Sequence, residues 1–543
     1  MAADQIRLTI SCSKLINVDG MMGKSDPFVR VNRKDDEHPT WAELAVTEGI
    51  RNNHDPVFLT KIFTNYEFEG NPELQFEVMD GDSKNPNKTQ LLGRIEIKLQ
   101  DLRNFERTAN LVNPNRAGNV GSIKVLGEVV SGRPTDTLKL SMAGQNIANK
   151  DGYLKGASDP YLKFFKVMPT GDKIEVAKTE VISTTKTPEW QPIMMNCMDL
   201  CNGKMDQKIY IECWDSDSVS KDDPIGDVET TMGDVLSKKT IQLLDYNKER
   251  GIDPGQIMLK SGGIIRYPTF EDYLADPKSK IHVTFAVDFT KTEDEKIHRK
   301  KATGYNYYEQ AIANAGEILV EDVGCEGSFN VLGFGGMFNG EQTVSHCYDL
   351  GVGLKTVQEV SNAYWNLVKN DKVVMEKKRF LKEVVPKAIE FAKAGGPADY
   401  SVLVVITHKS IDDTADTIDH LVDAAKAPMS VLVIGVGEDD FKNMADLYPV
   451  ADGTPQLQRK NTGENAIRNP LMFTTESIPR KHLKVGLPNQ FLQYMSKMKF
   501  APASWGSTNF ILPDGDWGPE QIFEAQEVGA KFRDLDLGGA ATK

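Results

Sequence analysis

Long hydrophobic runs are missing from this sequence. No apolar stretch approaches the ~20 residues that a membrane-spanning helix needs. The first residues, MAADQIRLTI, lack the layout of a secretory signal and the glycine at position 2 that myristoylation requires, and the last residues, AATK, are not a prenylation box. We therefore expect a cytoplasmic protein without a membrane-spanning segment.

Cysteine is also scarce, and basic residues are outnumbered by acidic ones. Only Cys197 and Cys201 among the six cysteines form a close pair, and no second pair completes a zinc spacing, so we expect reduced thiols. Lys and Arg number 64 against 78 Asp and Glu, which gives a net charge of −14. This balance argues against a nucleic-acid partner. It leaves membrane contact open, because bound cations can reverse the sign of an acidic site.

Patterns of catalytic residues are absent as well. The eight histidines are scattered, and no Ser/His/Asp or Cys/His arrangement stands out. The glycine-rich stretch Leu332-Gly333-Phe334-Gly335-Gly336 has neither the G-x-G-x-x-G nor the G-K-[ST] pattern of a phosphate-binding loop. We therefore expect a binding protein and not an enzyme.

The first half of the chain contains short alternating strands separated by turn residues. Their pattern predicts two antiparallel β-sandwiches, over residues 1–128 and 134–262, divided by a linker around Gly127 to Arg133. The predicted strands of the first are IRLTISCSKL, PFVRVN, LQFEVMD and LLGRIEIKL, and those of the second are LKLSMAGQNI, DPYLKFFKV, KIYIECWDSD and IGDVETT.

The second half alternates strands with helices. The run from Ile281 to Thr292, IHVTFAVDFTKT, predicts a strand buried on both faces, and FNVLGFGG, SVLVVIT and SVLVIGVG predict further strands. Helical patterns lie between them, at residues 307–320, 357–368, 376–394 and 412–427. This order predicts a doubly wound α/β domain with a parallel sheet over residues 263–500. Residues 501–543 are predicted to form an extended tail.

Acidic landmarks recur in the two predicted sandwiches. Ser-Asp-Pro precedes a strand at residues 25–27 and again at 158–160, and Asp-x-Asp follows a later strand at residues 80–82 and again at 215–217. This combination resembles the C2 domain. The resemblance implies that loops at one end of each sandwich gather five carboxylates around calcium, which takes six to eight oxygen ligands.

The second copy keeps this ligand pattern. Asp215, Asp217, Ser220 and Asp223 stand in a D-x-D-x-x-S-x-x-D spacing, and Asp159 and the more distant Asp151 supply the other loop. We expect calcium here. The alternative is a solvated set of acidic turns, in which Asp159 only holds the loop before Pro160.

The first copy keeps the ligand pattern less completely. It has four of the acidic residues, namely Asp19, Asp26, Asp80 and Asp82, but Gln90 stands where the fifth is expected. Lys84 and Lys88 lie in the same loop. We expect a weaker calcium site, with a protein-contact loop or a lysine in place of the ion as alternatives.

The order of two C2-like domains and an α/β unit resembles the copine family. The matching pieces of the α/β unit are FEDYL (270–274), VTFAVDFT, LGFGG (332–336), TVSH (343–346) and APMSVLVIGVGEDDF (427–441). The resemblance covers about residues 5 to 500. It implies a von Willebrand factor A-type domain after the two C2 domains.

Such an A domain binds magnesium through D-x-S-x-S, a separate Thr and a separate Asp. The first piece survives here as Asp288-x-Thr290-x-Thr292, but Thr407-His408-Lys409 stands where Thr-Asp-Gly is expected, and the separate Thr falls near Arg379. Magnesium prefers oxygen ligands. We therefore expect a degenerate metal site and a domain that binds by surface shape, with Asp288 paired with Lys409 or capping a helix.

The resemblance implies a calcium-dependent phospholipid-binding adaptor. Calcium in the second C2 domain would attract anionic lipid, and the A domain would recruit a protein partner. Met21-Met22 and Tyr153-Leu154 are the candidates for insertion into the membrane. The alternative is a constitutive scaffold in a large cytoskeletal or ciliary assembly, with vestigial metal sites.

Overall fold

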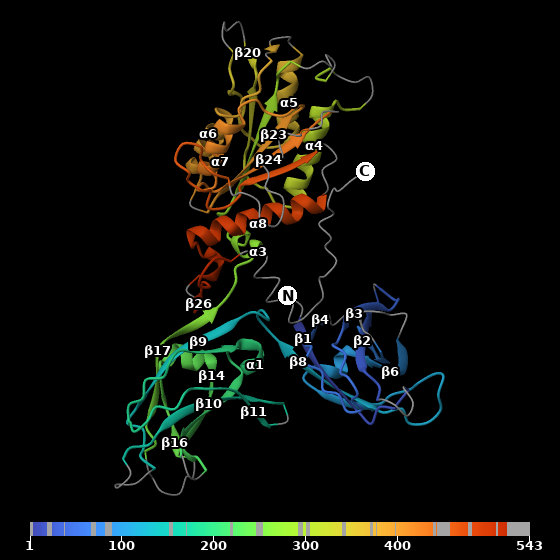
Figure 1. The fold of residues 1–543 in the computed structure, drawn as a ribbon, viewed down its shortest axis with the longest axis vertical. Coiled ribbons are helices and arrows are strands. Elements are labelled where there is room, and N and C mark those ends of the chain that lie inside the picture. The colour runs from blue at the N-terminus through green and yellow to red at the C-terminus, as the bar shows by residue number, and fades with distance from the viewer. Residues whose placement is uncertain are drawn as a thin grey trace. The chain divides into compact units, whose positions relative to one another are not determined.

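The computed structural model describes most of the chain. The described residues are 4–18, 24–36, 38–66, 72–81, 89–150, 156–169, 171–217, 221–245, 253–291, 297–299, 304–338, 344–369, 373–375, 377–396, 398–437, 441, 457–475, 480–506 and 509–517. They form two compact units (Figure 1). The first unit runs to Tyr267 and takes in Asn509–Ile511, and the second unit begins at Pro268 and takes in residues 512–517.

The first sandwich lies at the start of the first unit. Its elements are β1 Asp4–Ser13, β2 Pro27–Lys34, β3 Ala42–Val46, β4 Ile62–Tyr66, β5 Glu73–Asp80, β6 Gln90–Lys98, the 3-10 helix η3 Leu99–Leu102, β7 Glu106–Asn110 and β8 Ser122–Val130. They form sheets in the orders β4-β1-β8-β7 and β3-β2-β5-β6. Ile6, Leu8 and Ile10 of β1 are fully buried and alternate with polar residues, as in a strand with one face on a core.

The expected linker between the sandwiches is wrong in its first part, because Gly127 to Val130 belong to β8. A glycine is needed at this place in the strand. A Cβ atom on residue 127 would lie 2.0 Å from the carbonyl oxygen of Leu102. Gly127 therefore serves a close approach of two backbones and not a flexible connection. The domain boundaries expected from the sequence stay predictions.

The second sandwich completes the first unit. Its elements are β9 Thr137–Gln145, β10 Pro160–Val167, β11 Lys173–Lys178, β12 Ile193–Asn196, α1 Cys197–Cys201, β13 Lys208–Asp215, β14 Asp223–Thr231, α2 Met232–Lys238, β15 Thr240–Gln242, β16 Leu244–Asp245, β17 Gln256–Ile265 and β26 Phe510–Ile511. The sheets have the orders β11-β10-β13-β14-β16 and β12-β9-β17-β15. β26 comes from the expected tail and pairs in parallel with the end of β17. The tail beyond residue 517 lies outside the described residues.

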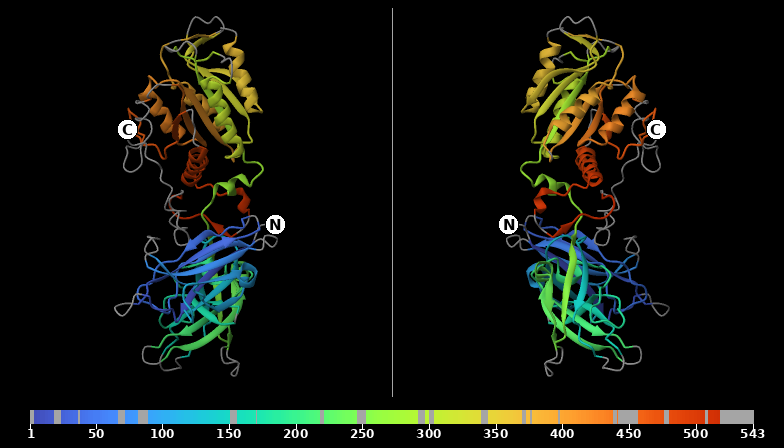
Figure 2. Two further views of the ribbon diagram at one scale, coloured as in Figure 1. Left: turned by 90° about the vertical axis from the view of Figure 1, so that its right-hand side faces the viewer. Right: turned by 90° about the vertical axis from the view of Figure 1, so that its left-hand side faces the viewer.

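The second unit is the α/β domain. Its elements are α3 Phe270–Leu274, β18 Ile281–Asp288, α4 Tyr307–Glu321, β19 Phe329–Phe334, β20 Gly336–Phe338, β21 Tyr348–Leu354, α5 Val357–Val368, β22 Val373–Met375, α6 Val384–Ala394, β23 Tyr400–Thr407, α7 Thr414–Ala424, β24 Met429–Gly435, β25 Leu471–Thr475, α8 Arg480–Met498 and the 3-10 helix η5 Ala503–Trp505. Figures 1 and 2 show helices on both faces of its main sheet, with α4 and α5 on one face and α6 and α7 on the other.

The main sheet has the order β21-β19-β18-β23-β24-β25 and is parallel except for the edge strand β21. β18 lies between β19 and β23, which confirms that it is an interior strand. The fold class predicted from the sequence is thus confirmed, with an antiparallel edge added. β18 and β23 end side by side, so Asp288 and Thr407 meet at the carboxyl edge of the sheet, where open α/β folds bind ligands.

The helix expected over residues 376–394 begins later, at Val384. Acidic side chains hold the preceding segment in a non-helical conformation. Asp412 accepts a hydrogen bond from the backbone N–H of Arg379, and Asp413 accepts hydrogen bonds from those of Leu381 and Lys382. These bonds satisfy the backbone without a helix and place Arg379 next to the end of β23.

Candidate functional site

The acidic loop end of the second sandwich is built around Ser158, Asp159 and Asp215. The Ser158 hydroxyl donates to the Ala148 carbonyl and accepts from the Lys150 N–H, which fixes the start of the loop that leads to Asp151. The Asp159 N–H donates to Asp215 Oδ1 (2.6 Å). The structure therefore brings Asp159, before β10, and Asp215, at the end of β13, into direct contact.

The first sandwich repeats this arrangement. The Ser25 hydroxyl bonds the Ile16 carbonyl and the Val18 N–H, and the Asp26 N–H donates to Asp80 Oδ1 (2.5 Å). A third contact also recurs. Asp26 Oδ1 accepts from the Asn52 N–H in the first sandwich, and Asp159 Oδ1 accepts from the Thr184 N–H in the second. The two copies therefore share a hydrogen-bonded scaffold as well as a sequence motif.

Asp222 is a residue of this loop end that the sequence pattern did not single out. Its Oδ2 accepts from the Tyr161 hydroxyl (2.6 Å), and its Oδ1 accepts from the Asp217 N–H (3.2 Å). The hydrogen bond from Tyr161 lowers the pKa of Asp222. Asp222 thus orients Asp217, while its neighbour Asp223 is exposed and lies opposite Asp215 in the β13–β14 register.

Several expected site residues lie outside the described residues. These are Asp19, Met21, Met22, Asp82, Lys84, Lys88, Asp151, Tyr153, Leu154, Ser220 and Thr292. Within the part of the chain that the structure describes, no three His, Cys, Asp or Glu residues form a group that could hold a metal ion. The described carboxylates of each sandwich are therefore only part of any calcium site. Their chemistry fits calcium, because the side-chain donors are hard oxygens and the backbone N–H of one aspartate bonds the carboxylate of the other in each copy.

Asp288, at the end of β18, is the centre of the candidate site in the α/β domain. The Thr290 N–H and hydroxyl donate to Asp288 Oδ1 at 2.8 and 2.7 Å. The Thr407 hydroxyl donates to Asp288 Oδ2 (2.8 Å). The structure thus brings Asp288 and Thr290 of the D-x-T-x-T pattern together with Thr407, whereas Thr292 lies outside the described residues.

Arg379 and His408 complete the surroundings of Asp288. Arg379 Nε and His408 Nδ1 lie 3.4 and 3.3 Å from Asp288 Oδ2. Arg379 Nη2 lies 3.1 Å from His408 Nε2, and a guanidinium can only donate, so Nε2 accepts and His408 is the neutral Nδ1–H tautomer. Tyr308 bonds the same Nδ1 through its hydroxyl (2.8 Å). Asp288 is therefore paired with Arg379 and not with Lys409 as expected, whereas Lys409 bonds Thr407 through its backbone.

These residues do not fit a magnesium ion. Magnesium requires near-octahedral oxygen coordination. Here a guanidinium and an imidazole approach the same oxygen of Asp288, and the fixed positive charge of Arg379 would repel a divalent cation.

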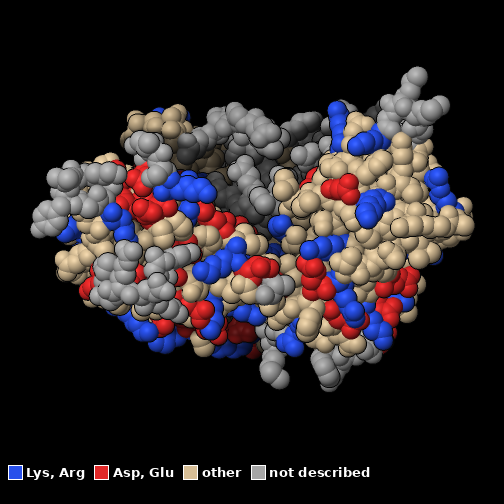
Figure 3. Space-filling model, turned by 90° about the horizontal axis from the view of Figure 1, so that it is seen from below, with Lys and Arg blue, Asp and Glu red and all other residues tan. Residues whose placement is uncertain are grey.

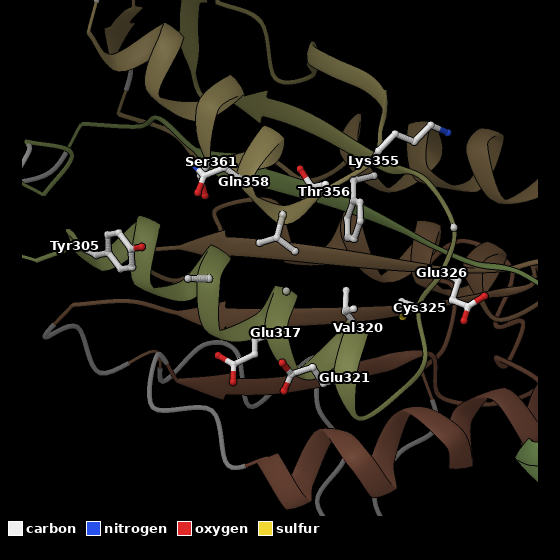
Figure 4. A pocket seen from close by; sticks show the side chains of 15 residues that line it. Tyr305, Glu317, Val320, Glu321, Cys325, Glu326, Lys355, Thr356, Gln358 and Ser361 are labelled. Atoms are coloured by element: carbon white, nitrogen blue, oxygen red, sulfur yellow. The ribbon is translucent and has the colours of Figure 1, made fainter.

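A separate hollow of about 540 Å³ lies on the α/β domain (Figure 4). Figure 4 shows its side chains coming from α4, from Cys325 and Glu326, and from the start of α5. Cys325 is the only thiol among the side chains that line it, and burial raises the pKa of this thiol to about 12. A thiol that stays protonated near neutral pH is a poor nucleophile, so Cys325 is not a candidate nucleophile in this hollow.

Comparisons with known proteins match the whole arrangement. A family model described as Copine matches residues 296–503, and a C2-domain model matches residues 6–113 and 140–245. Copine-A of Dictyostelium discoideum is 27% identical over 523 residues, which are 92% of this chain and 85% of Copine-A. Copine-B of the same organism is 26% identical over 533 residues, which are 93% of this chain and 98% of Copine-B.

The chain belongs to the copine family. Among solved structures, BON1-C2B matches part of this chain at 25% identity and a TM-score of 0.21. The match covers 24% of this chain and 92% of BON1-C2B. None of the helices described in this copine has the length and apolar character needed to cross a bilayer.

Proposed function

We propose that this copine is a calcium-dependent phospholipid-binding adaptor that recruits protein partners through its α/β domain. The single observation that supports the proposal is a repeated hydrogen bond that draws the two acidic loops together, from the Asp159 N–H to the Asp215 carboxylate and from the Asp26 N–H to the Asp80 carboxylate. Crowded carboxylates repel one another, and a bound cation relieves that repulsion. We assign no enzymatic activity.

In the second sandwich, calcium would be held by Asp151, Asp159, Asp215, Asp217 and Asp223. Asp19, Asp26, Asp80 and Asp82 would form a weaker site in the first sandwich. Each proposed ligand supplies oxygen, as calcium requires. Asp222 and Tyr161 would position Asp217 without contacting the ion.

Calcium would also supply positive charge at the acidic loop end. On the face drawn in Figure 3, the Lys and Arg side chains are interspersed with Asp and Glu side chains instead of forming one broad basic area. An acidic loop end repels anionic headgroups until cations bind to it. The protein would therefore be cytoplasmic without calcium and peripheral on anionic membranes with it.

A constitutive scaffold is the second candidate. The closed surroundings of Asp288 favour it, because an α/β domain without a metal site needs no ion to hold a partner. In this case the acidic loops would be vestigial, and the protein would belong to a cytoskeletal or ciliary assembly. The two candidates differ in whether calcium controls membrane binding.

The test is co-sedimentation of the full chain with phosphatidylserine vesicles, with calcium and with chelator. The test variant is Asp215→Asn/Asp217→Asn, which keeps the side-chain oxygen that bonds the Asp159 N–H. The control is Asp172→Asn/Asp206→Asn, which removes the same charge from exposed residues at the opposite ends of β10 and β13. We expect calcium-dependent binding by the native chain and the control, and loss of binding by the test variant. Absence of binding by the native chain in calcium would favour the scaffold.

A further inference from the structure

The negative charge of Asp288 is already balanced by a positively charged side chain of the protein, so a divalent ion is not needed to neutralise it. Asp288 carries one negative charge, and Arg379 is the permanently charged group that lies within ion-pair distance of it. His408 stays neutral because it accepts from Arg379. We infer that Arg379 serves as the built-in cation of the α/β domain and holds Asp288 in place of a divalent metal.

The side chains around Asp288 are buried, so this site is closed to solvent. Asp288, Thr290 and Thr407 are 0% exposed, and Arg379 and His408 are 6% and 5% exposed. An A-type metal site keeps one coordination position open for an acidic residue of a partner. Asp288 has no exposed surface among the described residues, so a carboxylate from outside would first have to displace a side chain that covers it. A buried charge also needs a partner, because its desolvation is costly, and the guanidinium provides that partner.

Arg379 is anchored from several directions, so its position is a built feature and not a chance contact of a flexible side chain. Its backbone N–H donates to Asp412 Oδ2 (2.7 Å), and Asp413 holds the next residues, Leu381 and Lys382, by their N–H groups. At the far end of the side chain, Nη2 donates to the Lys291 carbonyl (3.2 Å) as well as approaching His408. The guanidinium is thereby fixed between the ends of β18 and β23.

One consequence concerns regulation. The α/β domain would keep one conformation at its ligand edge whether divalent ions are present or not. Combined with the proposed function, on which this step rests, membrane binding would respond to calcium while partner binding would not respond to magnesium or manganese. The domain would then present a constant surface to its partner.

The test is hydrogen–deuterium exchange of the full chain, read by mass spectrometry in peptides that cover residues 285–291 and 405–413. Each protein is measured in chelator and in manganese, which accepts both oxygen and imidazole ligands. The variants are Arg379→Ser, which replaces the guanidinium with a small hydroxyl, and Arg379→Ser/Asp288→Asn. The control is Arg468→Ser, which removes another buried arginine of the same domain that bonds backbone carbonyls instead of Asp288.

We expect the native chain to exchange equally in chelator and manganese in both peptides. Arg379→Ser should exchange roughly tenfold faster or more in chelator, because it leaves a buried charge uncompensated, and manganese should slow that exchange only while Asp288 is present. Arg468→Ser should show no effect of manganese in these peptides.

Slower exchange of the native chain in manganese would overturn the inference, even if Arg379→Ser failed to fold. So would an Arg379→Ser variant that matches the native chain in chelator, or one on which manganese has no effect. None of these readings involves calcium, lipid or a partner. Failure of the proposed function and failure of this inference would therefore be distinguished.

Discussion

At the scale of single residues, His298 is the titratable group whose burial has the clearest consequence. Its ring stacks on Tyr308 and Phe289, with centroids 4.3 and 5.1 Å away, and its Nδ1 lies 3.0 Å from the Tyr364 hydroxyl. Burial lowers the pKa of His298 from 6.5 to about 4, and the nearby carboxylate of Asp288 opposes this shift only in part. His298 is therefore neutral in the folded protein at pH values where the unfolded chain is protonated.

This difference predicts acid sensitivity of the α/β domain. Between pH ~6.5 and ~4 the unfolded state binds more protons than the folded state, so stability falls as the pH drops through this window. The loss should reach at most about 3 kcal/mol. His298→Phe keeps the stacking and should flatten the pH dependence of the unfolding free energy, measured by urea denaturation. His38→Phe, at an exposed histidine, should not. Equal pH slopes in the native chain and His298→Phe would contradict the prediction.

At the scale of elements, β26 shows a short segment that stabilises a distant sheet. Its backbone bonds β17, since the Ile264 N–H donates to the Asn509 carbonyl (2.8 Å) and the Arg266 N–H to the Ile511 carbonyl (3.1 Å). Phe510 packs on the core of the second sandwich under the guanidinium of Arg266, 3.8 Å from its ring centroid. β26 thus covers an edge of β17 that would otherwise be open.

Removing the Phe510 side chain should weaken this edge. Phe510→Ala should destabilise the second sandwich by about 1–3 kcal/mol, because a half-buried aromatic ring loses its apolar contacts. The measurement is hydrogen exchange of the full chain in peptides that cover β17, where opening should become faster. Phe105→Ala, at a phenylalanine that is 66% exposed, is the control and should leave exchange in β17 unchanged. If exchange in β17 also stayed unchanged in Phe510→Ala, β26 would not contribute to stability.

Not every element could be predicted from the sequence, and β26 is an example. β1 and β18 could be predicted, because an alternating or continuous apolar pattern is a local property of the chain. β26 could not, because two residues carry no period and their partner strand lies far away in the sequence. α8 was not predicted either: Pro488 lies inside it, and proline normally disfavours a helix interior.

Some residues of the candidate sites could be predicted from the sequence, and others could not. The resemblance to C2 and A-type domains implied that Asp159 lies near Asp215 and Asp288 near Thr290, because each residue matches a short motif beside a predicted strand. Arg379 was located near the Asp288 site by counting, but its ion pair depends on the bonds from Asp412 and Asp413 that direct the side chain. Asp222 was missed because its role comes from Tyr161, on another strand.

At the scale of the whole molecule, a buried charged cluster joins the two sandwiches of the first unit. Glu128 of β8 accepts from Arg7 of β1 (2.9 Å) and from Lys166 of β10 (2.5 Å). The Asn202 side chain, after α1, accepts from both cations. All four residues are at most 5% exposed. The cluster therefore ties a residue pair of the first sandwich to a residue pair of the second.

Neutralising the centre of this cluster should destabilise the first unit. Glu128→Gln leaves Arg7 and Lys166 buried without their counter-charge, and breaking a buried pair costs about 3–5 kcal/mol. The free energy of unfolding from urea denaturation measures this loss. Glu106→Gln removes a carboxylate from an exposed pair with Lys124 and should cost no more than about 1 kcal/mol. Equal stability of the two variants would show that the cluster does not couple the sandwiches.

The most direct test of calcium binding by this copine is isothermal titration calorimetry of calcium into the full chain, without lipid. The native chain should give a saturable isotherm, and Asp215→Asn/Asp217→Asn should lose the tighter binding phase while keeping any weaker phase from the first sandwich. Magnesium should not reproduce the tighter phase, because it demands a smaller and more rigid coordination shell. Identical calcium isotherms for the native chain and the variant would contradict a calcium site at the loop end of the second sandwich.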